Sequence, residues 1–114
     1  MATISGLGRL GKDPKMSYTP KGDAQTHFPL AVRAGFGANE KTTWLSVLCF
    51  GKQAETMNQY LKKGSRIDFV AELMELRTYE KQDGTQGYSV DVKLLKAEFV
   101  DGIEKSSDVE PEEF

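Results

Sequence analysis

Residues Thr43–Phe50, Thr-Trp-Leu-Ser-Val-Leu-Cys-Phe, read as a β-strand with large side chains on both faces. Successive side chains of a strand point to opposite sides. One face holds the compact apolar side chains of Leu45, Val47 and Cys49, which suit a core. Trp44 and Phe50 share the other face, and a small domain has little reason to expose two large rings unless a flat ligand binds there. A strand buried on both faces, at an oligomer contact, is the alternative for this stretch.

Composition is that of one ordinary soluble domain. The chain has 114 residues, of which 39% are hydrophobic and 28% charged, enough for a single core. No apolar run approaches the roughly 20 residues of a membrane helix, and Met1–Gly6 does not read as a secretory signal. Cys49 is the sole cysteine, so no internal disulfide forms and the cytoplasm is the expected compartment.

Charge is unevenly distributed along the chain. Residues 101–114 carry six carboxylates against one lysine, a net charge of −5. Because the whole chain has a net charge of −2, residues 1–100 carry a net charge of +3. This asymmetry suggests a polyanion-binding body followed by a solvated interaction tail. A charge of +3 is also commonplace for a body of this size, so charge alone does not establish a nucleic-acid partner.

The periodicity predicts a mainly β body with one helix. We expect strands over residues 2–10, 25–34, 42–50, 66–78 and 88–100, a short extended piece at 16–18, and a loop at 35–41. Residues 51–64 have helical spacing and end at Lys62, Lys63 and Gly64, as a helix C-terminus should. Residues 79–88 form a hairpin with its tip near Asp83-Gly84. The acidic tail, residues 101–114, is expected to be disordered.

Three local features refine this reading. Pro29 cannot donate to a β-ladder, so its nitrogen must face an edge or a bulge. The strand parity blurs near Leu73 and Met74, which indicates a bulge. The glycines between Gly6 and Gly11 match a nucleotide-binding pattern, but Lys12-Asp13-Pro14 follows where that pattern needs a helix, so we reject a nucleotide site.

Five strands with one short helix between the third and the fourth are the layout of an OB-fold, an all-β Greek-key barrel. We assign it to residues 1–100. Such barrels bind oligonucleotides or oligosaccharides on the face of strands 2 and 3 and in the flanking loops. Trp44 and Phe50 lie on that third strand, which favours the interpretation that they are presented to a ligand.

The body also resembles the bacterial-type single-stranded DNA-binding protein family. Five segments carry the likeness, in the family's order and spacing: Gly8–Pro14, Tyr18–Gly22, Thr43–Glu55, Tyr60–Ser65 and Leu76–Gly84. The resemblance implies sequence-independent binding of single-stranded DNA in replication, recombination and repair. It implies base stacking on Trp44, Phe50, Tyr79 and Phe36, and phosphate contacts from Lys52, Lys62 and Lys63. Apart from the resemblance, Arg77 lies beside Tyr79, where it is expected to pair with phosphate or to stack. No cofactor or metal is implied. Of the other aromatic residues, Tyr60, Tyr88, Phe28, Phe69 and Phe99 are expected to pack.

The resemblance also implies a homotetramer, with which outward Leu48, Val70, Met74 and Leu76 agree because they need cover. The family's tail is usually longer and ends near Asp-Asp-Ile-Pro-Phe. Here Glu112, Glu113 and Phe114 end the chain, and they are expected to dock replication and repair proteins. The short tail suggests a phage, plasmid or accessory version of the protein, acting in the bacterial nucleoid or a host cytoplasm.

Two other function classes remain open beside DNA binding. An accessory OB module that docks primosome proteins would use the outward aromatic residues as an interface. An enzyme is disfavoured because one histidine, one inward cysteine and no paired carboxylates supply no nucleophile and base.

Overall fold

The structure is a computed structural model that describes residues 1–35 and 37–100. These residues form six strands and one α-helix: β1 (Thr3–Leu10), β2 (Lys15–Tyr18), β3 (Ala24–Ala34), β4 (Lys41–Phe50), α1 (Gly51–Tyr60), β5 (Arg66–Glu80) and β6 (Gln86–Phe99). A single 3₁₀ turn, Gly37–Asn39, precedes β4. The tail predicted at 101–114 lies outside the described residues.

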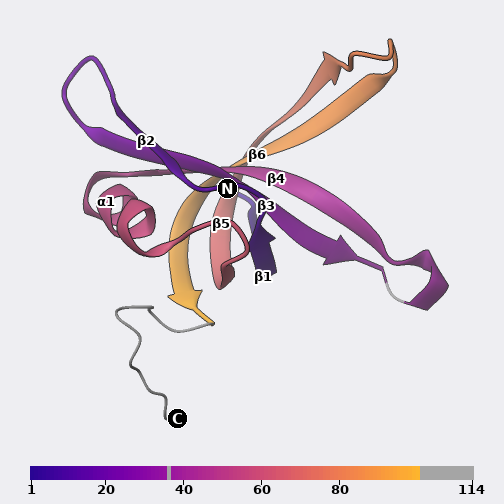
Figure 1. Cartoon of the computed structure of the whole chain (residues 1–114), viewed down its shortest axis with the longest axis horizontal. Coiled ribbons are helices and arrows are strands. Elements are labelled where there is room, and N and C mark those ends of the chain that lie inside the picture. The colour runs from indigo at the N-terminus through magenta and orange to yellow at the C-terminus, as the bar shows by residue number, and fades with distance from the viewer. Residues whose placement is uncertain (36, 101–114) are drawn as a thin grey trace.

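The strands close into a barrel (Figure 1). The sheet order is β1-β5-β6-β4-β3-β2, and a further pairing of β1 with β3 closes the barrel. All pairings are antiparallel except that of β4 with β6. The helix lies between β4 and β5. With β1 and β2 counted as one interrupted strand, this is the five-stranded OB arrangement that the sequence predicts.

The interruption between β1 and β2 lies opposite Pro29. Strand β3 pairs with β2 through residues 24–27 and with β1 through residues 30–32, which leaves Phe28 and Pro29 between the two ladders. The carbonyl of Pro29 accepts a hydrogen bond from the Gly11 N–H at 3.0 Å. Because the N and O of one strand residue point the same way, the proline nitrogen faces this gap. The prediction that this nitrogen faces an edge or a bulge is met by a break in the ladder.

The core fills the barrel along the predicted parities. Its largest fully enclosed side chains include Phe28, Phe69, Leu30, Leu45 and Val47, all exposed by 2% or less. Thr26 is the one buried polar side chain among the described residues, and its hydroxyl donates to the Ala54 carbonyl of α1 at 2.7 Å. That bond satisfies a group that would be costly to bury unpaired, and it fixes the helix against β3.

The helix is shorter than the sequence indicates. It buries Ala54 and Met57, as expected, but ends at Tyr60 rather than near Gly64. Leu61 turns to an extended conformation, φ −97° and ψ 152°, and its side chain is buried. Burial of that side chain competes with another helical turn, so Lys62 and Lys63 belong to a separate turn. No helix of the described residues is long and apolar enough to cross a membrane.

Strands β5 and β6 form a long hairpin that projects beyond the barrel (Figure 1). Its register shifts between Leu73 and Glu75, which leaves Met74 as the extra residue of the predicted bulge. A second shift between Val70 and Ala71 leaves Leu95 extra on β6. Bulges increase the bend and twist of a ladder, so the hairpin both closes the barrel at its base and leans out from it at its tip.

Candidate nucleic-acid interface

Strand β4 presents its aromatic side chains outward, as its alternation predicts. Leu45, Val47 and Cys49 are buried, whereas Trp44 is 49% exposed and Phe50 is 38% exposed. Within the single chain this outer face of β4 is therefore not covered. The two rings are six residues apart on one strand, roughly 20 Å at the usual rise, so they present two separate contact points.

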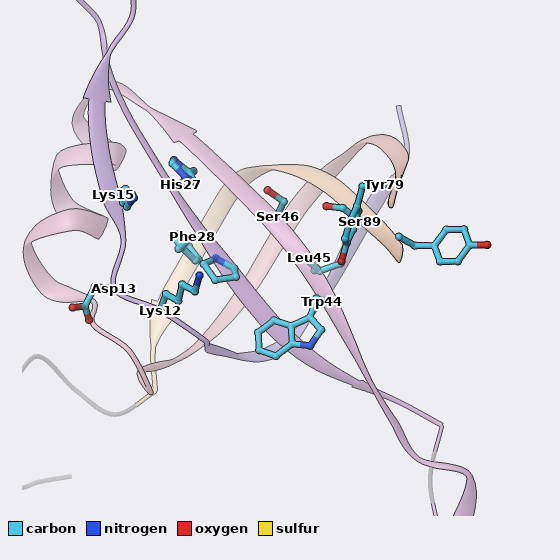
Figure 2. A pocket seen from close by; sticks show the side chains of 12 residues that line it. Lys12, Asp13, Lys15, His27, Phe28, Trp44, Leu45, Ser46, Tyr79 and Ser89 are labelled. Atoms are coloured by element: carbon cyan, nitrogen blue, oxygen red, sulfur yellow. The ribbon is translucent and has the colours of Figure 1, made fainter. Parts of the chain in front are cut away.

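A groove of about 340 Å³ runs across β4 from the barrel to the hairpin. Trp44, Leu45 and Ser46 line it from β4, and Tyr79, Tyr88 and Ser89 line it from the hairpin. Figure 2 shows Tyr79 and Ser89 on one side of these β4 residues and Lys12, Asp13, Lys15 and His27 on the other. Barrel closure thus brings together two of the predicted stacking residues, Trp44 and Tyr79, although 35 positions separate them in the sequence.

Each of these two rings lies against a glycine. A Cβ on Gly11 would stand 2.6 Å from a carbon of the Trp44 ring, and one on Gly87 would stand 2.5 Å from the Tyr79 ring. Neither glycine is among those with positive φ, so close approach of the ring, rather than backbone conformation, accounts for glycine there. A ring supported from behind by backbone keeps its other side available for a ligand.

Phe50 does not line this groove. It lies at the junction of β4 and α1, and the Lys93 ammonium stands 5.8 Å from its ring centroid. A cation over an aromatic face is attracted by the ring's quadrupole. Lys93 was not predicted as a site residue, but its β6 position opposite Leu48 places it beside Phe50. Phe50 with Lys93 therefore forms a second, separate place where a ring and a cation occur together.

The three predicted lysines divide into two groups by position. Lys52 lies in the first turn of α1. Lys62 and Lys63 lie in the turn after it, where the Lys63 N–H donates to the Asp13 carboxylate at 2.7 Å. That bond holds the turn beside Lys12 and Asp13, which line the groove. Lys12 and Lys15 were not predicted, because their approach to Trp44 depends on the path of the chain between β1 and β2.

Arg77 is engaged in an ion pair. Its Nε and Nη2 donate to the two oxygens of Asp91 at 2.6 Å and 3.0 Å. This hydrogen-bonded carboxylate raises the pKa of Arg77. The Ser89 hydroxyl is 3.4 Å from the same carboxylate. The predicted phosphate contact from Arg77 therefore requires phosphate to compete with Asp91.

The expectation for Tyr88 is wrong, and the other packing expectations hold. Tyr88 is 60% exposed and lines the groove, because it lies on the hairpin beyond the barrel. Tyr60 packs edge-on against Phe99, with ring centroids 6.1 Å apart. Phe28 and Phe69 are buried. Four predicted site residues, Phe36, Glu112, Glu113 and Phe114, lie outside the described residues.

Titratable side chains do not assemble into a reactive centre in the part of the chain that the structure describes. No three of its His, Cys, Asp and Glu side chains group as metal ligands. Burial raises the pKa of the Cys49 thiol to about 11, against a smaller lowering effect of a backbone hydrogen bond with Thr26. Thiolate is the nucleophilic form of cysteine, so this thiol is inert at neutral pH.

Comparison with known proteins places the chain in a family. Residues 1–100 match the single-strand binding protein family. The single-stranded DNA-binding protein of Clostridium tetani is 36% identical over 104 residues, 89% of this chain and 71% of that protein. The protein of the same name from Clostridium perfringens is 38% identical over 83% of this chain and 63% of its own length. That of Neisseria meningitidis is 30% identical over 94% and 64%. The chain belongs to the single-strand binding protein family.

Proposed function

We propose that this chain binds single-stranded DNA without sequence preference and without catalysis, in replication, recombination and repair. The observation that carries the proposal is the groove in which Trp44 and Tyr79 are exposed beside Lys12 and Lys15. Stacking of one base on an aromatic side chain is worth about 1–3 kcal/mol and tolerates any base. Lys12 and Lys15, on the side of Trp44 away from Tyr79, supply the electrostatic contact to the phosphates. The proposed place of action is the cytoplasm.

The roles of the remaining predicted residues follow from the same physics. Phe50 stacks a base at a distance from the groove, with Lys93 beside it. Lys52, Lys62 and Lys63 contact phosphates on the side of the barrel that carries α1. The proposed role of Phe36 is a further stacking contact, and that of Glu112, Glu113 and Phe114 is docking of replication and repair proteins.

Self-association is part of the proposal. Leu73, Met74 and Leu76 are exposed by 46%, 58% and 64% on β5. Large adjoining apolar side chains on a surface mark an interaction site, and assembly as a homotetramer would cover them. The same surface supports the alternative function, an accessory module that docks primosome proteins. Replacing Trp44, Phe50 and Tyr79 with Ala separates the two: loss of DNA binding with assembly intact supports the first, and loss of assembly the second.

Fluorescence titration tests the proposed function directly. Trp44 is the sole tryptophan of the chain, so its emission reports on the groove alone. Stacking of a base on the indole is expected to quench the emission of Trp44 as oligo-dT is added at low salt. A duplex of mixed sequence serves as the control, since its bases are already stacked. Unchanged emission with oligo-dT at low salt contradicts the proposal.

A further inference from the structure

A second hollow lies on the barrel wall away from the hairpin. Its volume is about 510 Å³, and it is lined by Leu7, Gly8 and Arg9 of β1, Ala31 and Arg33 of β3, and Arg66 of β5. Three arginines from three strands thus surround an apolar floor. Glu40 pairs with Arg33 at 3.3 Å, and Asp68 lies opposite Leu7 in the ladder. Neither lines the hollow, so its lining residues are purely cationic and apolar.

The register places this hollow in line with Trp44. Arg9 lies opposite Arg66 on one side and opposite Ala31 on the other, and Ala31 lies opposite Trp44. Directly opposite residues of an antiparallel pair share a face. The row Arg66–Arg9–Ala31–Trp44 therefore crosses four strands on the outer surface. With strands about 4.8 Å apart, Arg9 is roughly 10 Å and Arg66 roughly 15 Å from Trp44, within reach of neighbouring nucleotides of one bound strand.

Arg9 and Arg33 are held by contacts that leave donors available. Arg9 Nη1 donates to the Gly64 carbonyl at 3.0 Å, and a guanidinium has four further N–H groups. That bond also joins Arg9 to the turn that carries Lys62 and Lys63. The Arg33 side chain is 79% exposed, and its contact with Glu40 is weak for that reason. A phosphate, which the guanidinium fork binds with two parallel hydrogen bonds, can therefore replace it.

We propose that the Arg9–Arg33–Arg66 hollow binds the phosphodiesters of nucleotides that continue past Trp44, so that one DNA strand crosses from the hairpin groove over β4 and β3 to β1. Leu7 and Ala31 supply an apolar floor against which a sugar or base rests. This inference rests on the proposed function. It makes Trp44 the midpoint of the DNA path instead of its end.

Oligonucleotide length and salt dependence test this path. The variant Arg9→Gln/Arg33→Gln/Arg66→Gln is compared with the unchanged full chain on oligo-dT of roughly 4 and roughly 16 nucleotides, the limits of OB-fold sites. Each phosphate contact contributes about 0.7 to the slope of log K against log salt for a single strand. We expect the variant's slope to fall by roughly 2 on the longer oligomer and to stay unchanged on the shorter one, which the Trp44–Tyr79 groove holds alone.

Matched variants keep the result interpretable. The Arg→Lys triple variant keeps three positive charges and is expected to retain most of the salt slope. The single variant Arg33→Gln removes one positive charge from the hollow, and Lys96→Gln, on β6 outside the hollow, removes one elsewhere on the surface. Only Arg33→Gln is expected to lower the slope of log K against log salt. Equal slopes for all variants on the longer oligomer, or an altered solution mass with unaltered DNA binding, overturn the proposal. Failure of the unchanged chain to bind either oligomer would instead refute the proposed function.

Discussion

The Trp44 indole occupies the space that a side chain at Gly11 would need. A Cβ there would meet Cζ3 and Cη2 of the ring at 2.6 Å and 2.8 Å. The ring is therefore seated on the backbone that leads from β1 to β2, and the same relationship recurs between Tyr79 and Gly87. The glycines determine how far the rings stand from the barrel, although they offer the ligand no side chain.

Gly11→Ala is expected to weaken binding of oligo-dT while leaving the barrel folded. The atoms displaced are the outer atoms of one exposed ring, which can rotate away, and the loss cannot exceed the stacking contribution of about 1–3 kcal/mol. Oligo-dT affinity and thermal unfolding are measured together. In a Trp44→Leu background the same change should have no further effect on affinity. A cost that persists in that background would show that Gly11 acts without the ring.

The loss of oligo-dT affinity on alanine substitution should depend on where each aromatic residue lies. Trp44→Ala and Tyr79→Ala are each expected to reduce oligo-dT affinity by about 5- to 150-fold, because each removes one stacking surface of the groove. Phe50→Ala should have a comparable effect only on oligomers long enough to reach both sites. Tyr60→Ala is the comparison, since that ring packs on Phe99 and its loss should lower stability instead of DNA affinity. Equal effects of Phe50→Ala at every length would contradict the separation of the two sites.

Asp91→Asn should strengthen DNA binding. The Asp91 carboxylate forms two hydrogen bonds with Arg77, so removing its charge releases a cation next to Tyr79. The slope of log K against log salt is expected to steepen by about 0.7, one phosphate contact. Arg77→Gln, by contrast, should weaken binding, because it leaves the Asp91 carboxylate unpaired beside the bound DNA. Weaker binding by Asp91→Asn in a folded protein would show that the ion pair itself positions the hairpin for DNA.

Alkaline pH should destabilise the fold through Cys49. The thiol pKa rises from 9.0 to about 11 on folding, so the folded state favours the protonated form. Its contribution is complete below about pH 9 and is lost as pH rises to about 11, by about 2–3 kcal/mol at 1.36 kcal/mol per unit. Urea unfolding at several pH values measures this loss. Cys49→Ala, which lowers stability at all pH values, should show a smaller decline over that interval, and an equal decline would assign the effect to other groups.

The sequence predicted the fold well because its main signals are local. Alternation in β4 separated buried Val47 from exposed Trp44, and the blurred parity near Met74 located the bulge. The end of α1 was misplaced because the burial of Leu61 is a tertiary effect that helical spacing does not reveal. Tyr88 was misassigned for the same kind of reason: whether its strand lies in the barrel or beyond it depends on how far the hairpin extends.

The candidate site was less predictable than the fold. Trp44 and Tyr79 could be named separately, but a common groove requires barrel closure, and Lys12 and Lys15 enter it through the chain path between β1 and β2. Arg9, Arg33 and Arg66 are far apart in the sequence, and only the register of three strands brings them to one hollow. The neutralising partner of Arg77 was likewise visible only after β5 and β6 were paired.

Pro29 causes the break in the ladder that shapes the binding surface. Because its nitrogen cannot donate, four residues, 11–14, leave the ladder where two residues of β3 would otherwise be paired. That excursion carries Gly11 under the indole, Lys12 to the rim of the groove, and Asp13 to the turn after α1. A continuous ladder at this point would give a flatter sheet with nothing beneath Trp44. The break in hydrogen bonding is thus the place at which a structural barrel acquires a binding surface.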